Sequence, residues 1–277
     1  MALKLMYITN RPEIAQIADR CGVDRIFVDM EYLGKEERQS GDTVKSYHTV
    51  ADVEVVRRAV KKCEVLVRVN PITEKSDSFC GSKVEIDLTV DAGADVIMLP
   101  MAKTVTEVEQ FAAYVCGRTK TMLLLETKEA VEKLDEILDL GVIDEVHIGL
   151  NDLHLSLGKK FMFELLTDGT VESICKKIAM RKIPYGFGGI ARLGFGMLPA
   201  EYVICEHYRL GSSAAILSRS FANMNNVTDL EKIKNIFEVE TTRIREYENK
   251  LAFYSAEDFE RNRLETVRLV KQISERI

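Results

Sequence analysis

Short apolar runs recur along the chain, and most of them are followed by a segment with helical periodicity. The runs are nearly continuous stretches of valine, isoleucine and leucine, which is typical of strands buried on both faces of a parallel sheet. Eight such runs occur, at residues 3–9, 25–31, 64–70, 95–101, 121–127, 145–151, 185–190 and 214–220. The segments between them are amphipathic, and several end at a glycine suited to a helix C-cap, namely Gly22, Gly117 and Gly141.

The eightfold alternation of strand and helix predicts an α/β protein with a (β/α)8 fold, the TIM barrel. Such a barrel usually takes about 250 residues, and the chain has 277. An open doubly wound sheet is the alternative, but no G-x-G-x-x-G motif follows the first expected strand. We therefore expect residues 1–225 to form a barrel domain that carries the catalytic site.

The chain changes character after the eighth run. Residues 226–277 read as two long, charged helices with apolar stripes and no strand between them, and Asp229 and Ser255 are suitable N-caps. Two such helices exceed what one barrel repeat requires. We expect this C-terminal helical extension to pack either on the barrel or on a neighbouring subunit, and a homo-oligomer is predicted.

Composition narrows the possible partners. The net charge is −6 with no basic stripe, which argues against a nucleic-acid partner. No apolar run approaches the roughly 20 residues of a membrane-spanning helix, and the first residues lack the pattern of a signal peptide. The six cysteines are scattered without a C-x-x-C pair, which fits a reducing compartment. We expect a cytoplasmic protein that does not bind membranes.

Two acidic residues give the best indication of chemistry. Glu126 and Asp152 each stand at the end of an apolar run, 152 − 126 = 26 residues apart, which fits one strand, one helix and the next parallel strand. Neighbouring strands lie roughly 4.8 Å apart, so both carboxylates are expected at one edge of the sheet. Two carboxylates aimed at one point repel each other unless a proton or a metal lies between them. We therefore predict that this pair binds a divalent cation.

Further polar residues end the neighbouring runs. Asp29 and Glu31 end the second run, and Arg68 ends the third. In a (β/α)8 barrel the C-terminal ends of the strands carry the active site. Mg2+ prefers carboxylate and water ligands, and an arginine offers a fork that matches a substrate carboxylate. This composition favours a cation that holds an anionic oxygen substrate.

Several motifs carry a resemblance to a known family. The stretches are FVDMEY, LVRVN, AGADVIMLPM, LLLETKEAVEKLDEIL and IGLNDLHLSLG, in order from about residue 24 to residue 158. With them the chain resembles the HpcH/HpaI aldolase and citrate lyase β-subunit family. The resemblance implies a metal-dependent barrel in which Glu126 and Asp152 bind Mg2+ or Mn2+. It also implies that Arg68 holds a pyruvate-like unit and that Asp29 and Glu31 orient metal-bound water.

The chain departs from the family pattern beside the D-x-E motif. Many family aldolases have a histidine there, whereas this chain has Tyr32, whose hydroxyl with a pKa near 10 is a poor base at neutral pH. His48, in the polar loop that follows, is a candidate replacement; the alternative is a solvated loop residue. His147 lies within a strand and is expected to pack or to be hydrogen-bonded.

Glycines and serines late in the chain suggest a second subsite. Gly188 and Gly189, with Ser212 and Ser213 before the eighth run, resemble the phosphate-binding corner of many barrels. The alternative is that the glycines only let the backbone turn. If phosphate binds there, the aldehyde partner is phosphorylated, and Arg192 and Arg219 become candidates to hold it.

The function predicted from the sequence is a divalent-metal-dependent carbon–carbon lyase of the aldolase type. It would cleave or form an aldol adduct of a 2-oxo acid and an aldehyde through an enolate stabilised by the metal. Two alternatives stay open: a citrate-lyase-like enzyme that acts on an acyl-CoA, and a barrel that binds metal without catalysis. The sequence leaves open the aldehyde, the native metal, the general base and the number of subunits.

Overall fold

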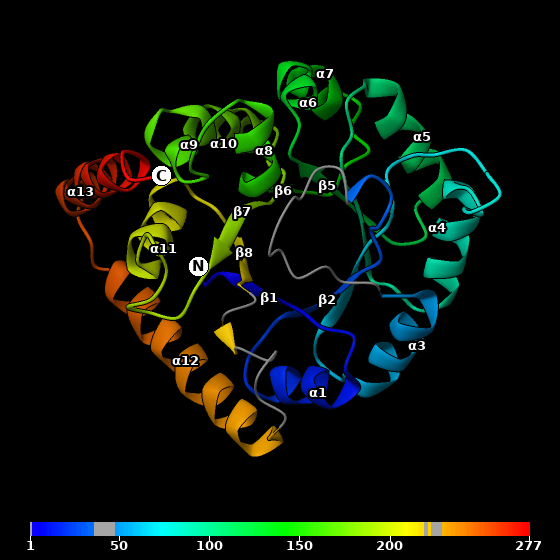
Figure 1. Cartoon of the computed structure of the whole chain (residues 1–277), viewed down its shortest axis with the longest axis horizontal. Coiled ribbons are helices and arrows are strands. Elements are labelled where there is room, and N and C mark those ends of the chain that lie inside the picture. Colours follow the sequence, from blue (N-terminus) through cyan, green and yellow to red (C-terminus); the bar gives the residue numbers. More distant parts are fainter. Residues whose placement is uncertain (1, 36–47, 219–220, 223–228) are drawn as a thin grey trace.

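Eight parallel strands form a closed barrel in the order β1 to β8, and β1 pairs with β8 to complete it (Figure 1). The computed structural model describes residues 2–35, 48–218, 221–222 and 229–277. The strands are β1 (Lys4–Ile8), β2 (Arg25–Asp29), β3 (Glu64–Arg68), β4 (Val96–Leu99), β5 (Lys120–Leu125), β6 (Glu145–Ile148), β7 (Tyr185–Ile190) and β8 (Ala214–Leu217). The predicted (β/α)8 barrel is therefore confirmed.

Helices surround the barrel, as Figure 1 shows. They are α1 (Pro12–Arg20), α3 (Val50–Ala59), α4 (Ser82–Asp91), α5 (Val105–Val115), α6 (Lys128–Glu132), α7 (Leu134–Asp139), α8 (Leu150–Ser156), α9 (Glu164–Thr167), α10 (Thr170–Met180), α11 (Ala200–Arg209), α12 (Leu230–Leu251) and α13 (Ala256–Ser274). Gly22, Gly117 and Gly141 follow helices with positive φ, as their sequence positions predict.

Except for β7, the strands end earlier than the apolar runs do. β2 ends at Asp29 and β3 at Arg68, so Glu31 and Asn70 belong to the segments that follow the strands. The alternation of side chains along each strand sends one set outward to the helices and the other into the barrel. The inward set forms an apolar layer at mid-height that includes Met6, Phe27 and Leu124. This layer supports the polar residues above it.

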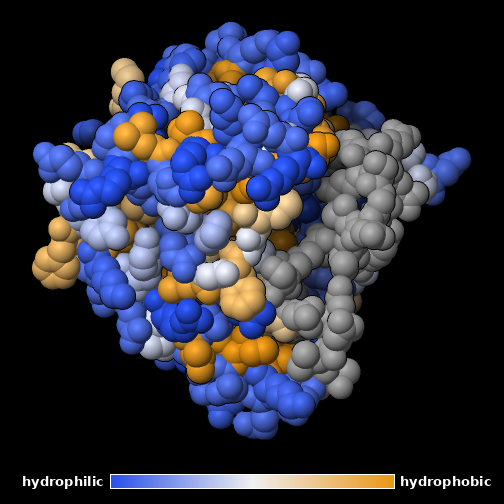
Figure 2. Space-filling view, turned by 60° about the vertical axis from the view of Figure 1, so that its left-hand side comes forward, coloured by the Kyte–Doolittle hydropathy of each residue, from blue (hydrophilic) through white to orange (hydrophobic). Residues whose placement is uncertain are grey.

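The two C-terminal helices pack on the outside of the barrel. α12 contacts α1 and α11, and α13 contacts α11 and α9. Asp229 caps α12 through the backbone N–H groups of Glu231 and Lys232, and Ser255 caps α13 through that of Asp258. When the left-hand side of Figure 1 is turned forward, hydrophobic residues appear in separate groups among hydrophilic ones (Figure 2). The division into two domains at residue 225 stays a prediction.

The length and the apolar character of a helix decide whether it could cross a membrane. Among the described residues, none of the helices combines the length and the apolar character that crossing a membrane requires.

A network of charged side chains fills the N-terminal end of the barrel interior. Arg25 is fully buried, and its Nη1 and Nη2 donate to the two oxygens of Glu145 at 2.6 Å each. Its Nε donates to Glu64 Oε2 at 2.7 Å, and Lys120 Nζ donates to Glu64 Oε1 at 2.6 Å. Arg25 pairs with both carboxylates, and Glu64 also pairs with Lys120. The guanidinium therefore closes this end of the barrel.

Replacement of this arginine tests its role. We expect Arg25→Met to lower the free energy of unfolding by roughly 3–5 kcal/mol, because it leaves a buried carboxylate without its partner. Lys4→Met is the control, since Lys4 Nζ lies 3.9 Å from Glu64 Oε2 and its side chain is 45% exposed. Urea unfolding measures both variants. Equal stability of Arg25→Met and the wild type would contradict a stabilising role for Arg25.

Candidate active site

A cavity of about 220 Å³ opens at the C-terminal end of the barrel. Its charged lining consists of Arg68, Glu126 and Asp152, and Gly188 and Gly189 form part of its wall. Apolar side chains of the layer below, among them Phe27 and Leu124, form much of the rest. The structure thus brings together, in one small space, five of the residues selected from the sequence.

Arg68 is shared between two acidic residues. Its Nε donates to Asp29 Oδ1 and its Nη2 to Asp29 Oδ2, both at 2.9 Å, and its Nη1 lies 3.3 Å from Glu31 Oε2. The guanidinium carbon also lies 5.6 Å from the centre of the Phe27 ring. Burial acts to raise the pKa of Asp29, but the charges of Arg68 and Lys35 outweigh it and hold that pKa well below its usual range. Asp29 is therefore a carboxylate at neutral pH.

Glu126 is a buried carboxyl group at the end of β5. Its Oε1 accepts a hydrogen bond of 3.1 Å from the backbone N–H of Met101, a residue held at a φ of 53°. Because Met101 is not a glycine, this left-handed conformation costs energy. The conformation directs the backbone N–H of Met101 at Glu126. Gly149 makes room on the other side, because a Cβ there would lie 2.8 Å from Glu126 Oε2.

The protonation of Glu126 reflects its neighbours. Burial raises its pKa to about 8, the charge of Arg68 opposes this, and the carboxylates of Asp152 and Glu31 add to it. Glu126 lies near enough to Asp152 for the two carboxylates to repel each other. Asp152 belongs to the first turn of α8 rather than to a strand, and it is half-buried. Asn151, next to it in the same turn, also lines the cavity.

Three residues that follow β2 have different roles. Tyr32, which replaces the family histidine, is 41% exposed, and its hydroxyl donates to the carbonyl of Ser78 at 3.4 Å. His48 lies beside Asp29, where its Nδ1 accepts the Asp29 backbone N–H at 2.9 Å. Lys35, which sequence reasoning missed, is buried and donates from Nζ to Asp29 Oδ2 at 2.8 Å. Its position just after a turn gave no signal of this direction.

His147 lines the cavity, whereas the sequence suggested only that it packs or is hydrogen-bonded. Its Nε2 lies 3.1 Å from the carbonyl oxygen of Gly188, and a carbonyl only accepts, so Nε2 carries the proton. Burial lowers its pKa to about 4, so the imidazole is neutral at pH 7. Among the described residues Nδ1 has no hydrogen-bond partner. Strand alternation was the available signal, because His147 shares the inward face of β6 with Glu145.

The proposed phosphate corner is split between the two ends of the barrel. Ser212 and Ser213 precede β8, so they lie at its N-terminal end, away from the cavity. Ser212 Oγ is 2.7 Å from His207 Nδ1, and Ser213 Oγ donates to the carbonyl of Tyr185 at 3.0 Å. The structure therefore does not bring these serines to Gly188 and Gly189. The reason is that only residues after a parallel strand reach the C-terminal edge.

The two arginines considered for phosphate do not reinforce that corner. Arg192 lies in the loop after β7, with its guanidinium carbon 4.6 Å from the centre of the Phe195 ring. Arg219 lies outside the described residues. Gly188 has a φ of 51°, and a Cβ there would come within 2.7 Å of a methyl group of Leu150. This glycine is needed for close packing of β7 against α8.

The donor set fits a hard divalent cation. Among the described residues, the charged groups around Arg68 and Glu126 are Lys35 and Arg68 against Asp29, Glu31, Glu126 and Asp152. Two positive and four negative charges give a formal sum of −2 when all six groups are ionised. In the described part of the chain, no group of three or more His, Cys, Asp or Glu residues is arranged to hold a metal. Mg2+ usually takes only one or two protein carboxylates and keeps several waters. Two carboxylate donors, Glu126 and Asp152, and a net charge of −2 therefore match Mg2+.

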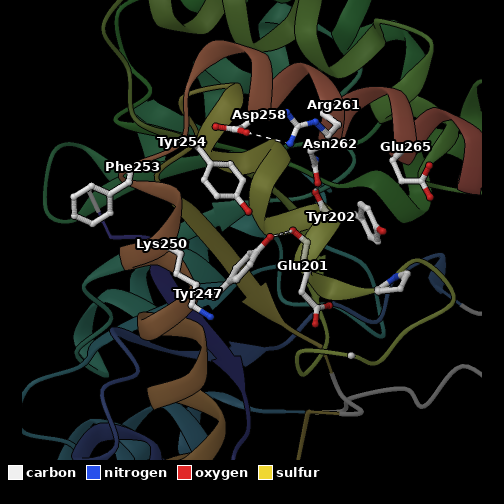
Figure 3. A pocket seen from close by; sticks show the side chains of 12 residues that line it. Glu201, Tyr202, Tyr247, Lys250, Phe253, Tyr254, Asp258, Arg261, Asn262 and Glu265 are labelled. Carbon is white, nitrogen blue, oxygen red and sulfur yellow. Dashed lines mark hydrogen bonds and ion pairs between the residues drawn. The ribbon is translucent and has the colours of Figure 1, made fainter.

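A larger groove of about 810 Å³ lies between α11, α12 and α13 (Figure 3). Its ion pair lies near the surface, since Arg261 Nη1 lies 3.3 Å from Asp258 Oδ1 and the Arg261 side chain is 77% exposed. Glu201 Oε2 is buried and has no hydrogen-bond partner among the described residues. Tyr247 donates to the carbonyl of Glu201 at 3.3 Å. Phe253 points away from the other labelled side chains in Figure 3. Buried charges converge at the barrel mouth instead, so we place the candidate site there.

Comparison with known proteins identifies the family. The model of the HpcH/HpaI aldolase/citrate lyase family matches residues 4–165. The chain belongs to this family. Its members are aldolases and citrate-lyase-like lyases, and the family implies a small-molecule substrate. Among curated proteins, none matches the chain significantly in sequence.

Solved structures show the same fold at low sequence identity. An HpcH/HpaI aldolase from Desulfitobacterium hafniense DCB-2 is 18% identical, with a TM-score of 0.58 over 78% of this chain and 86% of that one. A family protein from Burkholderia cenocepacia J2315 is 14% identical, with a TM-score of 0.61 over 84% and 95%. Citrate synthase SbnG is 14% identical, with a TM-score of 0.59 over 90% and 95%. These similarities establish the barrel and not the reaction.

The protonation of Glu126 gives a prediction for the metal-free protein. An unfolded glutamate titrates near 4.5 and the folded one at about 8, so between these pH values the folded state binds more protons. Stability in EDTA should therefore fall as pH rises through this window, by at most about 1.4 kcal/mol per pH unit. Glu126→Gln should remove this part of the decline.

Thermal unfolding across this pH range measures the effect. Glu129→Gln, an exposed change in α6, should retain the wild-type decline. If the stability of the wild type and of Glu126→Gln declined in parallel as pH rises, Glu126 would not titrate as described.

Proposed function

We propose that the protein is a divalent-metal-dependent carbon–carbon lyase that cleaves or forms an aldol adduct of a 2-oxo acid. The observation that carries the proposal is the pair Glu126 and Asp152, which line one cavity with Arg68 and repel each other there. In this proposal both carboxylates hold Mg2+ or Mn2+. The cation, when bound, acts as a Lewis acid that withdraws electron density from a substrate oxygen.

Arg68 supplies the fixed positive charge of the site. Asp29 and Glu31 hold three of its nitrogens, so the guanidinium plane is fixed before a ligand arrives. A planar fork of this kind matches a carboxylate, and a pre-oriented donor needs no reorganisation as charge develops on the substrate. The role proposed for Arg68 is to bind the carboxylate of the 2-oxo acid and to stabilise negative charge beside it.

Asp29 and Glu31 act through Arg68 in this proposal. Asp29 is completely buried and carries three charge-assisted hydrogen bonds, from two nitrogens of Arg68 and from Lys35. Glu31 is 2% exposed. Both fix the guanidinium and leave its outer hydrogens toward the cavity. A role for them in orienting water at the site is part of the proposal.

The general base distinguishes this function from its alternative. Tyr32 directs its hydroxyl to Ser78, and Nδ1 of His48 is occupied by the Asp29 backbone N–H. These contacts favour, as a second candidate, a barrel that binds metal and a 2-oxo acid without breaking a carbon–carbon bond. A citrate-lyase-like reaction on an acyl-CoA is distinguished by its need for coenzyme A. Exchange of the methyl protons of pyruvate with solvent deuterium separates these possibilities.

Changes to the two acidic residues test the proposed metal site. With Mg2+ or Mn2+ present, we expect the wild type to exchange the methyl protons of pyruvate, and we expect Glu126→Gln and Asp152→Asn each to slow this by roughly 10²–10³-fold. The reason is that each variant loses one of two anionic donors. Proton NMR follows the exchange. Retention of full exchange after dialysis against EDTA would exclude the metal-dependent mechanism.

A second test addresses the substrate carboxylate. Arg68→Lys keeps the charge and loses the fork, so we expect oxalate to bind the Mn2+-loaded variant roughly ten to a hundred times more weakly, while Mn2+ itself binds at least as well. Calorimetry measures both affinities. Arg192→Lys is the matched control, because Arg192 also lies over an aromatic ring but outside the cavity. Equal loss in both variants would remove Arg68 from the proposed role.

A further inference from the structure

Lys35 is a buried lysine outside the set of residues used so far for binding. It is 2% exposed, and it follows the turn that begins at Tyr32, whose carbonyl accepts the Lys35 backbone N–H at 3.2 Å. Its Nζ donates to Asp29 Oδ2 at 2.8 Å and to the carbonyl of Glu31 at 3.3 Å. Lysine is almost never fully buried unless it is paired. This ammonium therefore has a specific partner, and that partner is Asp29.

The charges around Lys35 explain why a second cation is needed. Asp29 and Glu31 both draw on the single guanidinium of Arg68. Asp29 Oδ2 accepts from both Arg68 and Lys35, so the negative charge of Asp29 is divided between two cations and does not fall on Arg68 alone. The extra cation lets Arg68 present positive charge to the cavity that it lines.

We propose that Lys35 is a positioning residue for the anionic substrate, which neutralises Asp29 so that Arg68 remains able to bind a carboxylate. This inference rests on the proposed function, because it takes the ligand of Arg68 to be an anion. Lys35 does not line the cavity, and it acts through Asp29 and Arg68. Burial and the charge of Arg68 lower the pKa of Lys35 while Asp29 opposes this, as expected for two cations that share one carboxylate.

The proposal predicts that loss of the Lys35 charge affects the binding of the anion oxalate and of the cation Mn2+ differently. Removal of a positive charge near the mouth weakens binding of an anion and does not weaken binding of a cation. A purely structural role of Lys35 would weaken both, because a disordered site binds neither well. The two binding constants therefore separate an electrostatic role from a structural one.

The experiment compares Lys35→Met, Lys35→Arg and Lys103→Met with the wild type. Lys103 is exposed and follows β4, so it controls for loss of one positive charge elsewhere on the molecule. Binding of Mn2+ is measured first, and oxalate, a dianion of the size of the pyruvate enolate, is then titrated into the Mn2+-loaded proteins. We expect oxalate to bind Lys35→Met about tenfold more weakly, with Mn2+ bound as tightly or more tightly. Lys35→Arg keeps the positive charge, so it should bind oxalate about as tightly as the wild type does.

The outcomes are distinguishable. Unchanged oxalate affinity in Lys35→Met, or equal weakening of Mn2+ and oxalate, overturns the inference and leaves the proposed function standing. A wild type that binds no oxalate in the presence of Mn2+ overturns the proposed function itself. If Lys35→Met does not fold, Lys35→Gln replaces it, because glutamine can still donate to Asp29 without a charge and the same two affinities decide the result.

Discussion

The imbalance of charge at the C-terminal end of the barrel is the constraint on which the other features of the site depend. Four carboxylates and two cations are held close together, and several of these groups are nearly excluded from water. Buried charge is tolerated only where it is paired. Asp29 and Glu31 obtain their partner in Arg68, whereas Glu126 has a backbone N–H and an unfavourable neighbour. The proposed cation would relieve this repulsion.

Much of this arrangement could be predicted from the sequence. The apolar runs are strongly periodic, so they predicted the number and order of the strands. Barrel topology then placed the residues that follow each strand at one end, which selected Arg68, Glu126 and Asp152 as neighbours. What the pattern could not supply was local geometry. Asp152 lies in a helical turn, and Met101 adopts a left-handed conformation that no composition argument predicts.

The predictions that failed have specific physical reasons. Ser212 and Ser213 were grouped with the glycines of β7 by composition, although residues that precede a parallel strand lie at the opposite end from those that follow it. His147 was expected to pack or to be hydrogen-bonded, and it is hydrogen-bonded to Gly188; its place in the cavity lining was not predicted. Lys35 was missed because the direction of its side chain, just after a turn, does not follow from a periodic pattern. Its partner Asp29 lies only six residues earlier, and the turn between them brings the two side chains together.

The filled base of the barrel restricts how molecules move through the protein. Arg25 and its partners occupy the interior at the N-terminal end, so the barrel is not a tube with two openings. Any compound that reaches Arg68 enters at the mouth and leaves by the same route. A reaction that yields two products would then release them in sequence, the outer one first, and the fragment held deepest would act as a competitive inhibitor of the next cycle.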